Sequence, residues 1–214
     1  MAASTDTTPR RAGRPRSPVP RETLISAAIT AFANHGYAAA SLDRIAEEAG
    51  IRKSSLLHRF GSKQALYLES LATVLGNLGE MVATAATSDA SFVDRLDGLS
   101  SVVTDYLSDE PRAARLLYRE VMDLGPFFAG SGGDVYRQVL ATAVAFVQAG
   151  SDSGVFDVGS ASDTIISIVG VHLTYFATHE LSGQVTGAPI FDEAGRARRK
   201  REVIVQIRRL CGVR

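Results

Sequence analysis

The sequence predicts an all-α protein, built from a small N-terminal three-helix unit and a larger C-terminal helical body. Every strongly periodic segment carries its apolar residues at helical spacing, and none alternates as a β-strand would. Two short helices are predicted within residues 41–63, joined by a tight turn at Gly50. With 214 residues, of which 45% are hydrophobic and 21% charged, the chain is long enough to bury a substantial core.

Residues 1–19 are rich in Ser, Thr, Pro and Arg and are expected to form a disordered basic arm. Arg14 and Arg16 flank Pro15, a pattern similar to the Arg-Pro segments that lie in the minor groove of A·T-rich DNA. The arm could instead attract phosphates without sequence preference, or be inert.

Residues 21–35 are predicted to form an amphipathic helix that ends at Gly36, because apolar residues recur at three- and four-residue intervals. A second short helix is expected to follow Ser41, whose hydroxyl could cap it. Its apolar stripe ends at Ala49, and Gly50 follows, where a left-handed residue costs least.

Residues 53–60 are predicted to form the second helix of the pair. Its inward candidates are Leu56, Leu57 and Phe60. The outer face contains cations, hydroxyls and an imidazole but no carboxylate: Arg52, Lys53, Ser54, Ser55, His58 and Arg59. Such a donor-rich helix suits the major groove of DNA. An ordinary helical hairpin with a basic solvent face is the alternative.

A long helix is predicted to begin after Ser62 and to continue to about Thr87, which takes it out of the small unit and into the body. Ser91 is expected to cap the next helix, and Pro111 to begin another. The helical segments predicted in the body are 92–107, 111–122, 135–149, 160–181 and 194–210, with a loop at 124–133.

The formal net charge is zero, but the charge is unevenly distributed. Residues 1–70 hold 10 Lys and Arg against 6 Asp and Glu, residues 71–194 hold 5 against 16, and residues 195–214 hold 8 against 1. An acidic body would repel a duplex and favour docking through the basic end. The basic run at 195–201 is interpreted mainly as an offset to the acidic body, with a second nucleic-acid patch as the alternative.

Cys211 is the single cysteine, which excludes an intramolecular disulfide and any cysteine-based zinc site. No secretory signal is expected, and the most hydrophobic run, 165–177, is shorter than the roughly 20 residues of a spanning helix. These features predict a cytoplasmic protein with no membrane partner.

The run from Gly36 to Leu66 resembles the DNA-binding signature of tetracycline-repressor (TetR) type transcriptional regulators. The matching residues are Ile45, Ala46, Ala49, Gly50, Ile51, Phe60, Ser62, Lys63 and Leu66. Two positions depart from the pattern. Arg52 stands where the family often has Ser or Thr, and Leu57 stands where it often has a tyrosine that touches a phosphate. His58 or Arg59 could supply that contact instead.

The resemblance implies a helix-turn-helix DNA-binding domain at 20–66 and a helical ligand-binding and dimerisation domain at 67–214. Candidate DNA-binding residues are Ser41, Arg52, Lys53, Ser54, Ser55, His58, Arg59 and Lys63. In the family the last two long helices pair with those of a second copy. Candidate dimer-interface residues are Ile165, Val169, Phe176, Val203, Ile207 and Leu210, for which an intrachain core is the alternative.

The resemblance also implies a cavity for a small molecule inside the body. Candidate pocket residues are Tyr106, Tyr118, Met122, Phe127, Phe128, Phe146, His172, Tyr175, Phe176 and His179, for which a plain core is the alternative. His172 and His179 lack the spacing of a metal site, and no phosphate loop, nucleophile elbow or zinc-protease motif occurs. We therefore expect no metal, no cofactor and no enzymatic activity.

Together these features predict a homodimeric repressor that binds a palindromic double-stranded DNA operator and is released by a small-molecule effector. Two alternatives come from other functional classes. One is an all-helical protein-interaction module whose basic hairpin binds an acidic partner. The other is a small-molecule-binding protein with weakened DNA binding, an alternative that stays open because Leu57 stands in place of the family's tyrosine.

Overall fold

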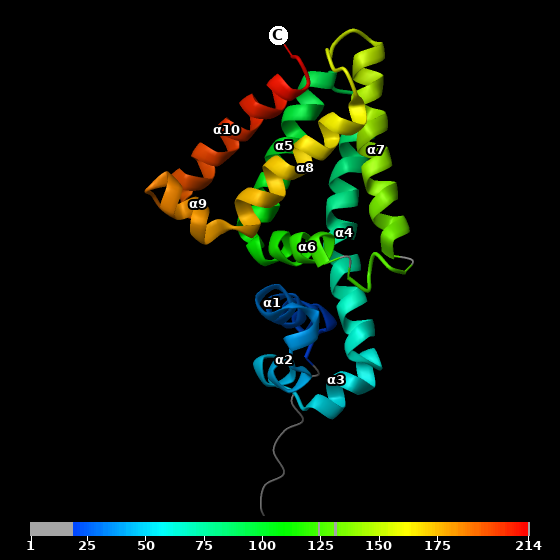
Figure 1. Cartoon of the computed structure of the whole chain (residues 1–214), viewed down its shortest axis with the longest axis vertical. Coiled ribbons are helices and arrows are strands. Elements are labelled where there is room, and N and C mark those ends of the chain that lie inside the picture. The colour runs from blue at the N-terminus through cyan, green and yellow to red at the C-terminus, as the bar shows by residue number, and fades with distance from the viewer. Residues whose placement is uncertain (1–18, 124, 131, 214) are drawn as a thin grey trace, which may run out of the picture.

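The computed structural model describes residues 19–123, 125–130 and 132–213, and the prediction for Arg14 and Arg16 lies outside them. Within this part of the chain all regular secondary structure is helical, so the all-α prediction is confirmed (Figure 1). None of the described helices is both long and apolar enough to cross a membrane.

The small N-terminal unit consists of α1 (Arg21–Ala39), α2 (Leu42–Glu48) and α3 (Lys53–Phe60), at the lower end of Figure 1. Apolar side chains from all three helices meet in its interior. The first helix runs past its predicted end, because a kink at Gly36, with φ of 74°, is followed by one further turn. Such a φ is rarely adopted by residues other than glycine.

Helix α4 (Lys63–Thr87) leaves the small unit and runs along the body, as predicted (Figure 1). Its 25 residues correspond to a length of about 38 Å at the helical rise. The hydroxyl of Ser62 caps its start by accepting from the N–H of Ala65 at 3.0 Å. Ser91 caps the following helix through the N–H of Asp94 at 3.1 Å, so both predicted caps are confirmed.

In the described part of the body, six further helices lie around α4. They are α5 (Phe92–Asp109), α6 (Pro111–Asp123), α7 (Gly132–Asp152), α8 (Ala161–Ala177), α9 (His179–Thr186) and α10 (Glu193–Leu210). Figure 1 shows α6 lying across the underside of the body, directly above α1. The predicted single helix at 160–181 is wrong: it breaks at Thr178. The freed carbonyl of Ala177 accepts instead from Arg115 Nε at 3.1 Å.

Basic side chains of α10 form ion pairs with carboxylates of α5. Arg196 pairs with Asp109, Lys200 with Asp105 at 2.6 Å, and Arg208 with Asp97 at 2.8 Å. Each surface pair contributes little stability by itself. Their arrangement along both helices means that part of the C-terminal basic run faces the body's own carboxylates.

Candidate nucleic-acid interface and apolar cavity

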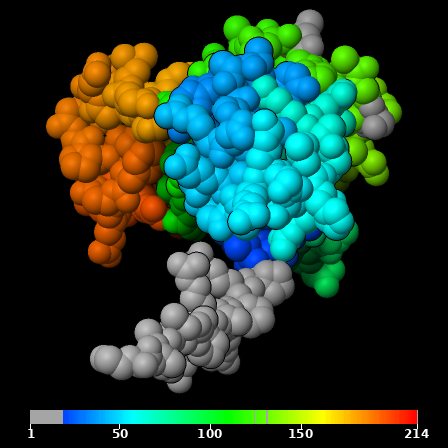
Figure 2. All heavy atoms as spheres, turned by 90° about the horizontal axis from the view of Figure 1, so that it is seen from below, coloured from blue at the N-terminus to red at the C-terminus, as the bar shows by residue number. Residues whose placement is uncertain are grey.

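Helix α3 presents a polar surface at the end of the molecule farthest from the body (Figure 1). Arg52, Lys53, Ser54, Ser55 and His58 are all exposed. The buried side of the same helix consists of Leu56 and Phe60, which pack into the core of the small unit. Figure 2 looks at this end of the molecule and shows the residues around α3 at its surface.

Two glycines in left-handed conformations bracket α3 and set its direction. Gly50 has φ of 69° and Gly61 has φ of 77°. After Gly50, the N–H of Ile51 donates to the carbonyl of Ala46 at 2.9 Å, which turns the chain sharply between α2 and α3. A side chain would meet no atoms at either glycine, so the backbone conformation and not space selects glycine there.

The outer face of α3 is less free of carboxylates than its own sequence indicates. Lys53 Nζ lies 2.9 Å from a carboxylate oxygen of Asp43, which belongs to α2. Both side chains are exposed, so the pair is weak and exchangeable. A nucleic-acid phosphate could therefore replace Asp43 as the partner of Lys53.

Two other cations of the predicted interface contact the small unit itself. Arg59 donates to the carbonyl of Val19. Lys63 Nζ donates to the carbonyl of Ala38 at 2.9 Å and lies 5.1 Å from the ring centre of Tyr37.

Ser41 occupies the N-cap position of α2 but makes no capping hydrogen bond, so its predicted capping role is wrong.

The small unit is attached to the body through α6. Arg119 Nε donates to the carbonyl of Ala33 on α1 at 2.9 Å, and Arg112 donates to the Thr30 hydroxyl at 3.1 Å. Next to Arg119 lies the carboxylate of Glu120, which is only 1% exposed. These contacts connect the underside of the body to the first helix of the small unit.

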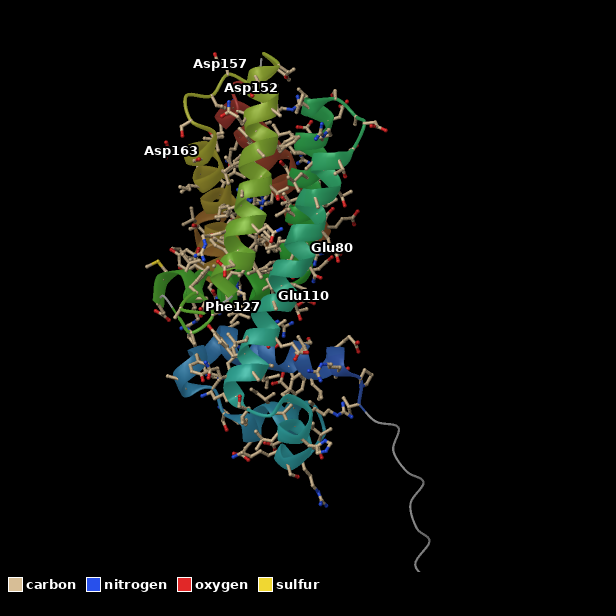
Figure 3. The ribbon with its side chains drawn as sticks, turned by 90° about the vertical axis from the view of Figure 1, so that its right-hand side faces the viewer. Glu80, Glu110, Phe127, Asp152, Asp157 and Asp163 are labelled. Carbon is tan, nitrogen blue, oxygen red and sulfur yellow. The ribbon has the colours of Figure 1, made fainter. Side chains whose placement is uncertain are left out.

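The Glu120 carboxylate accepts three hydrogen bonds, from the Tyr67 hydroxyl at 2.5 Å and from the N–H groups of Phe127 and Phe128 at 2.8 and 3.0 Å. Burial, and then the bond to Glu120, raise the pKa of Tyr67. The Tyr67 ring packs edge-on against Phe32 of α1. Figure 3 shows Phe127 at the lower end of the body, close to the small unit.

Sequence reasoning did not identify Glu120. A signal was available, since Glu120 follows Leu116 and Leu117 by four and three residues, on the apolar stripe of α6. A carboxylate in that position must find hydrogen-bond donors inside the protein.

A partly open cavity of about 130 Å³ lies in the body, between α4, α5, α6, α7, α8 and α10. Its wall is almost entirely apolar. Three wall residues carry polar groups: Ser100, Tyr136 and His172. A mostly apolar cavity with a few polar groups is the usual form of a small-molecule site.

Only two of the ten candidate pocket residues, Phe146 and His172, line this cavity. The structure places the other eight elsewhere: Tyr106, Tyr118, Met122, Phe127, Phe128, Tyr175, Phe176 and His179. Met122 is 67% exposed, whereas Phe176 is fully buried in the core. His179 lies beside Arg115, 3.3 Å from its guanidinium. Aromatic type was therefore a poor guide to which residues face the cavity.

Tyr136 and Ser100 are the polar wall residues that sequence reasoning missed. Tyr136 lies on α7 and begins a stripe that continues through Val139, Leu140 and Ala143 to Phe146, all of which line the cavity. That helical spacing was visible in the sequence, but it does not distinguish a cavity wall from an ordinary core.

Three buried hydroxyls of α5, of which that of Ser100 belongs to the cavity wall, are satisfied within their own helix. Ser100 donates to the carbonyl of Leu96, Thr104 to that of Ser100, and Ser108 to that of Thr104, each at 2.7 Å. His172 behaves differently. Its Nδ1 has no hydrogen-bond partner among the described residues. Burial, with the nearby charge of Arg199, lowers the pKa of His172 to about 3, so the imidazole is neutral.

The predicted dimer interface requires a correction. Ile165, Phe176, Val203 and Ile207 are buried in the core of the single chain, so the prediction that they face a second copy is wrong. Val169 is partly buried and lines the cavity, whereas Leu210 is exposed. The large apolar side chains that α8 and α10 do expose are Ile166, Val205 and Leu210.

Comparison with known proteins finds a matching family model for the small N-terminal unit and another for the body. Residues 24–70 match the family model described as "Bacterial regulatory proteins, tetR family". Residues 93–207 match that described as "Tetracyclin repressor-like, C-terminal domain". The HTH-type transcriptional repressor SCO4008 of Streptomyces coelicolor is 32% identical over 148 residues, which cover 68% of this chain and 72% of that protein.

Solved structures show the same fold at low sequence identity. The TetR family regulator PfmR from Thermus thermophilus has a TM-score of 0.72 and 16% identity, covering 92% of this chain and 98% of its own. The regulator FadR from Bacillus subtilis, in complex with stearoyl-CoA, has a TM-score of 0.69 and 16% identity, covering 91% and 100%. Since both domain models and the Streptomyces relative agree, the chain belongs to the tetR family of bacterial regulatory proteins and is a helix-turn-helix DNA-binding transcriptional regulator.

Proposed function

We propose that this regulator is a cytoplasmic homodimeric repressor that binds a palindromic operator and leaves it when a small molecule fills the cavity. The observation that carries this proposal is the path of α4, which begins beside α3 and supplies Leu75 and Leu78 to the cavity wall. Repression as the direction of control is supported by the name of the Streptomyces relative.

In the proposed complex the outer face of α3 enters the major groove. Arg52, Lys53, Ser54, Ser55 and His58 address base edges or nearby phosphates, because they are exposed donors on one face. Ser41, Arg59 and Lys63 contact mainly phosphates. Arg59 and Lys63 would have to keep or exchange their present carbonyl partners when DNA binds.

A dimer is proposed because one helix-turn-helix reads only a few base pairs, whereas a twofold pair reads two half-sites. The exposed apolar side chains of Ile166, Val205 and Leu210 support an interface on the outer faces of α8 and α10. A second copy would remove these side chains from water.

Release by a ligand requires that the cavity and α3 be mechanically connected. Leu117 of α6 lines the cavity, and the same helix holds α1 through Arg119 and holds Tyr67 of α4 through Glu120. A ligand that displaces α4 or α6 would therefore move the small unit. By linkage, the ligand and the DNA then lower each other's affinity by the same factor. The acyl-CoA bound to the Bacillus FadR, which has the same fold, supports a small-molecule role for the body.

Selection of binding sites from random duplexes by the full-length protein tests the proposal. The expected consensus is an inverted repeat whose half-site centres lie about 10 base pairs, or a multiple of this, apart. Recovery of no enriched sequence would support instead the small-molecule-binding protein with weakened DNA binding.

Substitutions test which residues of the small unit contact DNA. Arg52→Ala and Lys53→Ala should weaken binding to the selected site, and a change at Lys53 or Ser55 should alter base preference. Lys63→Ala should weaken all sequences about equally and lower the salt slope by about one unit. Arg201→Ala, which removes an exposed cation from α10, is the matched control and should change neither quantity.

A further inference from the structure

The wall of the cavity offers a ligand almost no polar surface. Leucine, isoleucine, valine, alanine and phenylalanine side chains form it, apart from Ser100, Tyr136 and His172. No charged side chain lines it within the part of the chain that the structure describes. An ion placed there would lose its hydration without gaining a counter-ion, which is strongly unfavourable.

The three polar wall residues are themselves uncharged. The Ser100 hydroxyl already donates to the carbonyl of Leu96 at 2.7 Å. His172 is 6% exposed, and burial lowers its pKa to about 3, so the imidazole is neutral. Burial also raises the pKa of the Tyr136 hydroxyl, which therefore keeps its proton. The wall presents neutral groups to whatever occupies the cavity.

A buried cation of α10, Arg199, makes its contacts outside this wall. One terminal nitrogen of its guanidinium donates to the carbonyl of Val171, and its guanidinium carbon lies 4.0 Å from the ring centre of Tyr175. Arg199, Val171 and Tyr175 are not among the residues that line the cavity. Its charge therefore reaches the cavity as a field that disfavours a cation, and not as a partner for an anion.

The charge around the cavity also opposes a ligand with an anionic headgroup. Residues 71–194 supply every wall residue except Ile207, and they hold 5 Lys and Arg against 16 Asp and Glu. A ligand that placed only its apolar tail in the partly open cavity would hold its headgroup against this acidic body. The stearoyl-CoA of the Bacillus FadR is therefore a poor guide to the ligand of this chain.

The volume of the cavity limits the size of its ligand. Its value of about 130 Å³ is similar to that of a cavity of about 150 Å³, lined by Leu, Ile and Phe, that binds benzene in another protein. A single hydrocarbon ring with a small substituent is therefore the expected size.

We propose that the ligand of this cavity is an uncharged, apolar molecule of about the size of one ring, such as a monocyclic hydrocarbon. The inference rests on the proposed function only in taking the cavity as the effector site. Such a ligand leaves water and gains van der Waals contacts with the wall, and it asks for no counter-ion.

Four probes separate this class from charged ones. Toluene represents the proposed ligand. Benzoate and benzylammonium have nearly the same shape but carry a negative and a positive charge. Hexanoyl-CoA tests an apolar tail whose anionic headgroup stays outside. Isothermal titration calorimetry of the full-length protein measures all four, and wild type should bind toluene at least about 100-fold more tightly than any of the other three.

Two substitutions change the same wall in opposite directions. Ala143→Leu fills the cavity and should weaken toluene binding at least about 10-fold. Ala141→Leu, on the exposed side of the same helix, is the matched control and should bind toluene as wild type does. Leu140→Ala enlarges the cavity and should raise the affinity for naphthalene, followed by its fluorescence, at least about 10-fold over wild type.

Absence of toluene binding would overturn the proposal, as would tighter binding of any of the three charged probes. Toluene binding that Ala143→Leu leaves unchanged would place the ligand elsewhere and would overturn it too. If one of the two wall variants does not fold, the other decides. Toluene binding in the cavity without any change in operator affinity would leave this inference standing and overturn the proposed release by ligand. Release from the operator by a charged compound that Ala143→Leu abolishes would overturn this inference alone.

Discussion

The small N-terminal unit and the helical body hold their candidate sites in opposite ways. The small unit carries its site on an outer surface, where exposed residues of α3 lie over the buried Leu56 and Phe60. The body carries its site as unfilled space, lined by side chains from six helices. A surface is determined by the spacing of residues within one helix. A void depends on how segments distant in the sequence pack together. The spacing of residues along a helix therefore predicts the surface of α3 well, but it predicts the wall of the cavity poorly.

The largest effect is expected at the joint between the two regions. Glu120→Ala would leave the Tyr67 hydroxyl and two backbone N–H groups without their acceptor. The expected loss is about 3 kcal/mol of unfolding free energy, which corresponds to roughly 6–12 °C in Tm for a chain of this size. Thermal and urea denaturation measure it.

Tyr67→Phe is the matched control for Glu120→Ala, since it removes one donor and leaves the carboxylate bonded to the loop. It should cost about 1 kcal/mol. Equal losses in the two variants would show that the backbone bonds of Glu120 contribute nothing, and that its effect comes from the bond to Tyr67 alone.

A second prediction concerns acid stability of the body. Burial lowers the pKa of His172 to about 3, below its ordinary value of 6.5, so the unfolded chain takes up a proton that the folded chain does not. The stability that depends on neutral His172 is therefore complete above pH 6.5 and declines as pH falls towards the folded pKa. Between pH 6.5 and 5 the loss should be about 2 kcal/mol. Urea denaturation of wild type and His172→Gln measures the difference, and parallel pH profiles would contradict it.

A third prediction concerns a substitution that fills the cavity and leaves the surface of α3 unchanged. Ala143→Leu adds atoms to the cavity wall and should stabilise the chain by about 1 kcal/mol while lowering ligand affinity at least about 10-fold. Ala141→Leu, on the exposed side of the same helix, should do neither. Denaturation and calorimetry are the measurements. Undiminished ligand binding in Ala143→Leu would place the ligand site elsewhere.

The smallest expected effect separates two serines of the small unit. Ser62→Ala should cost about 1 kcal/mol, because its hydroxyl caps α4. Ser41→Ala should leave stability unchanged, because its hydroxyl makes no cap bond, but should weaken DNA binding if it contacts a phosphate. Denaturation together with operator affinity distinguishes these roles. A stability loss in Ser41→Ala equal to that in Ser62→Ala would contradict the assignment.

The fold could be predicted from the sequence largely because its signals are local. The position of α3, the start of α6 at Pro111 and the caps of Ser62 and Ser91 all follow from residues within a few positions of one another. The break at Thr178 could not be predicted, because the helix end is stabilised by Arg115, more than 60 residues away. Long-range contacts of this kind leave no pattern in the segment that they interrupt.

In the candidate sites, too, features set by local sequence could be predicted, whereas contacts between distant segments could not. The exposed residues of α3 were identified, but the carbonyl partners of Arg59 and Lys63 were not, since they come from other segments. In the body, Phe146 and His172 were identified among eight others that lie elsewhere. Arg199 was assigned to a solvated basic run because one sequence cannot reveal which cation of that run α8 would cover.

The series of hydroxyls along α5 has a consequence for what the body can distinguish. Because Ser100, Thr104 and Ser108 each donate to a carbonyl of their own helix, their protons are not available to a guest. Of the polar residues in the cavity wall, Tyr136 and His172 are therefore the ones left to donate to a guest molecule. The body should select against sugars and other molecules rich in hydroxyl groups, and such compounds make a stringent set of non-inducers.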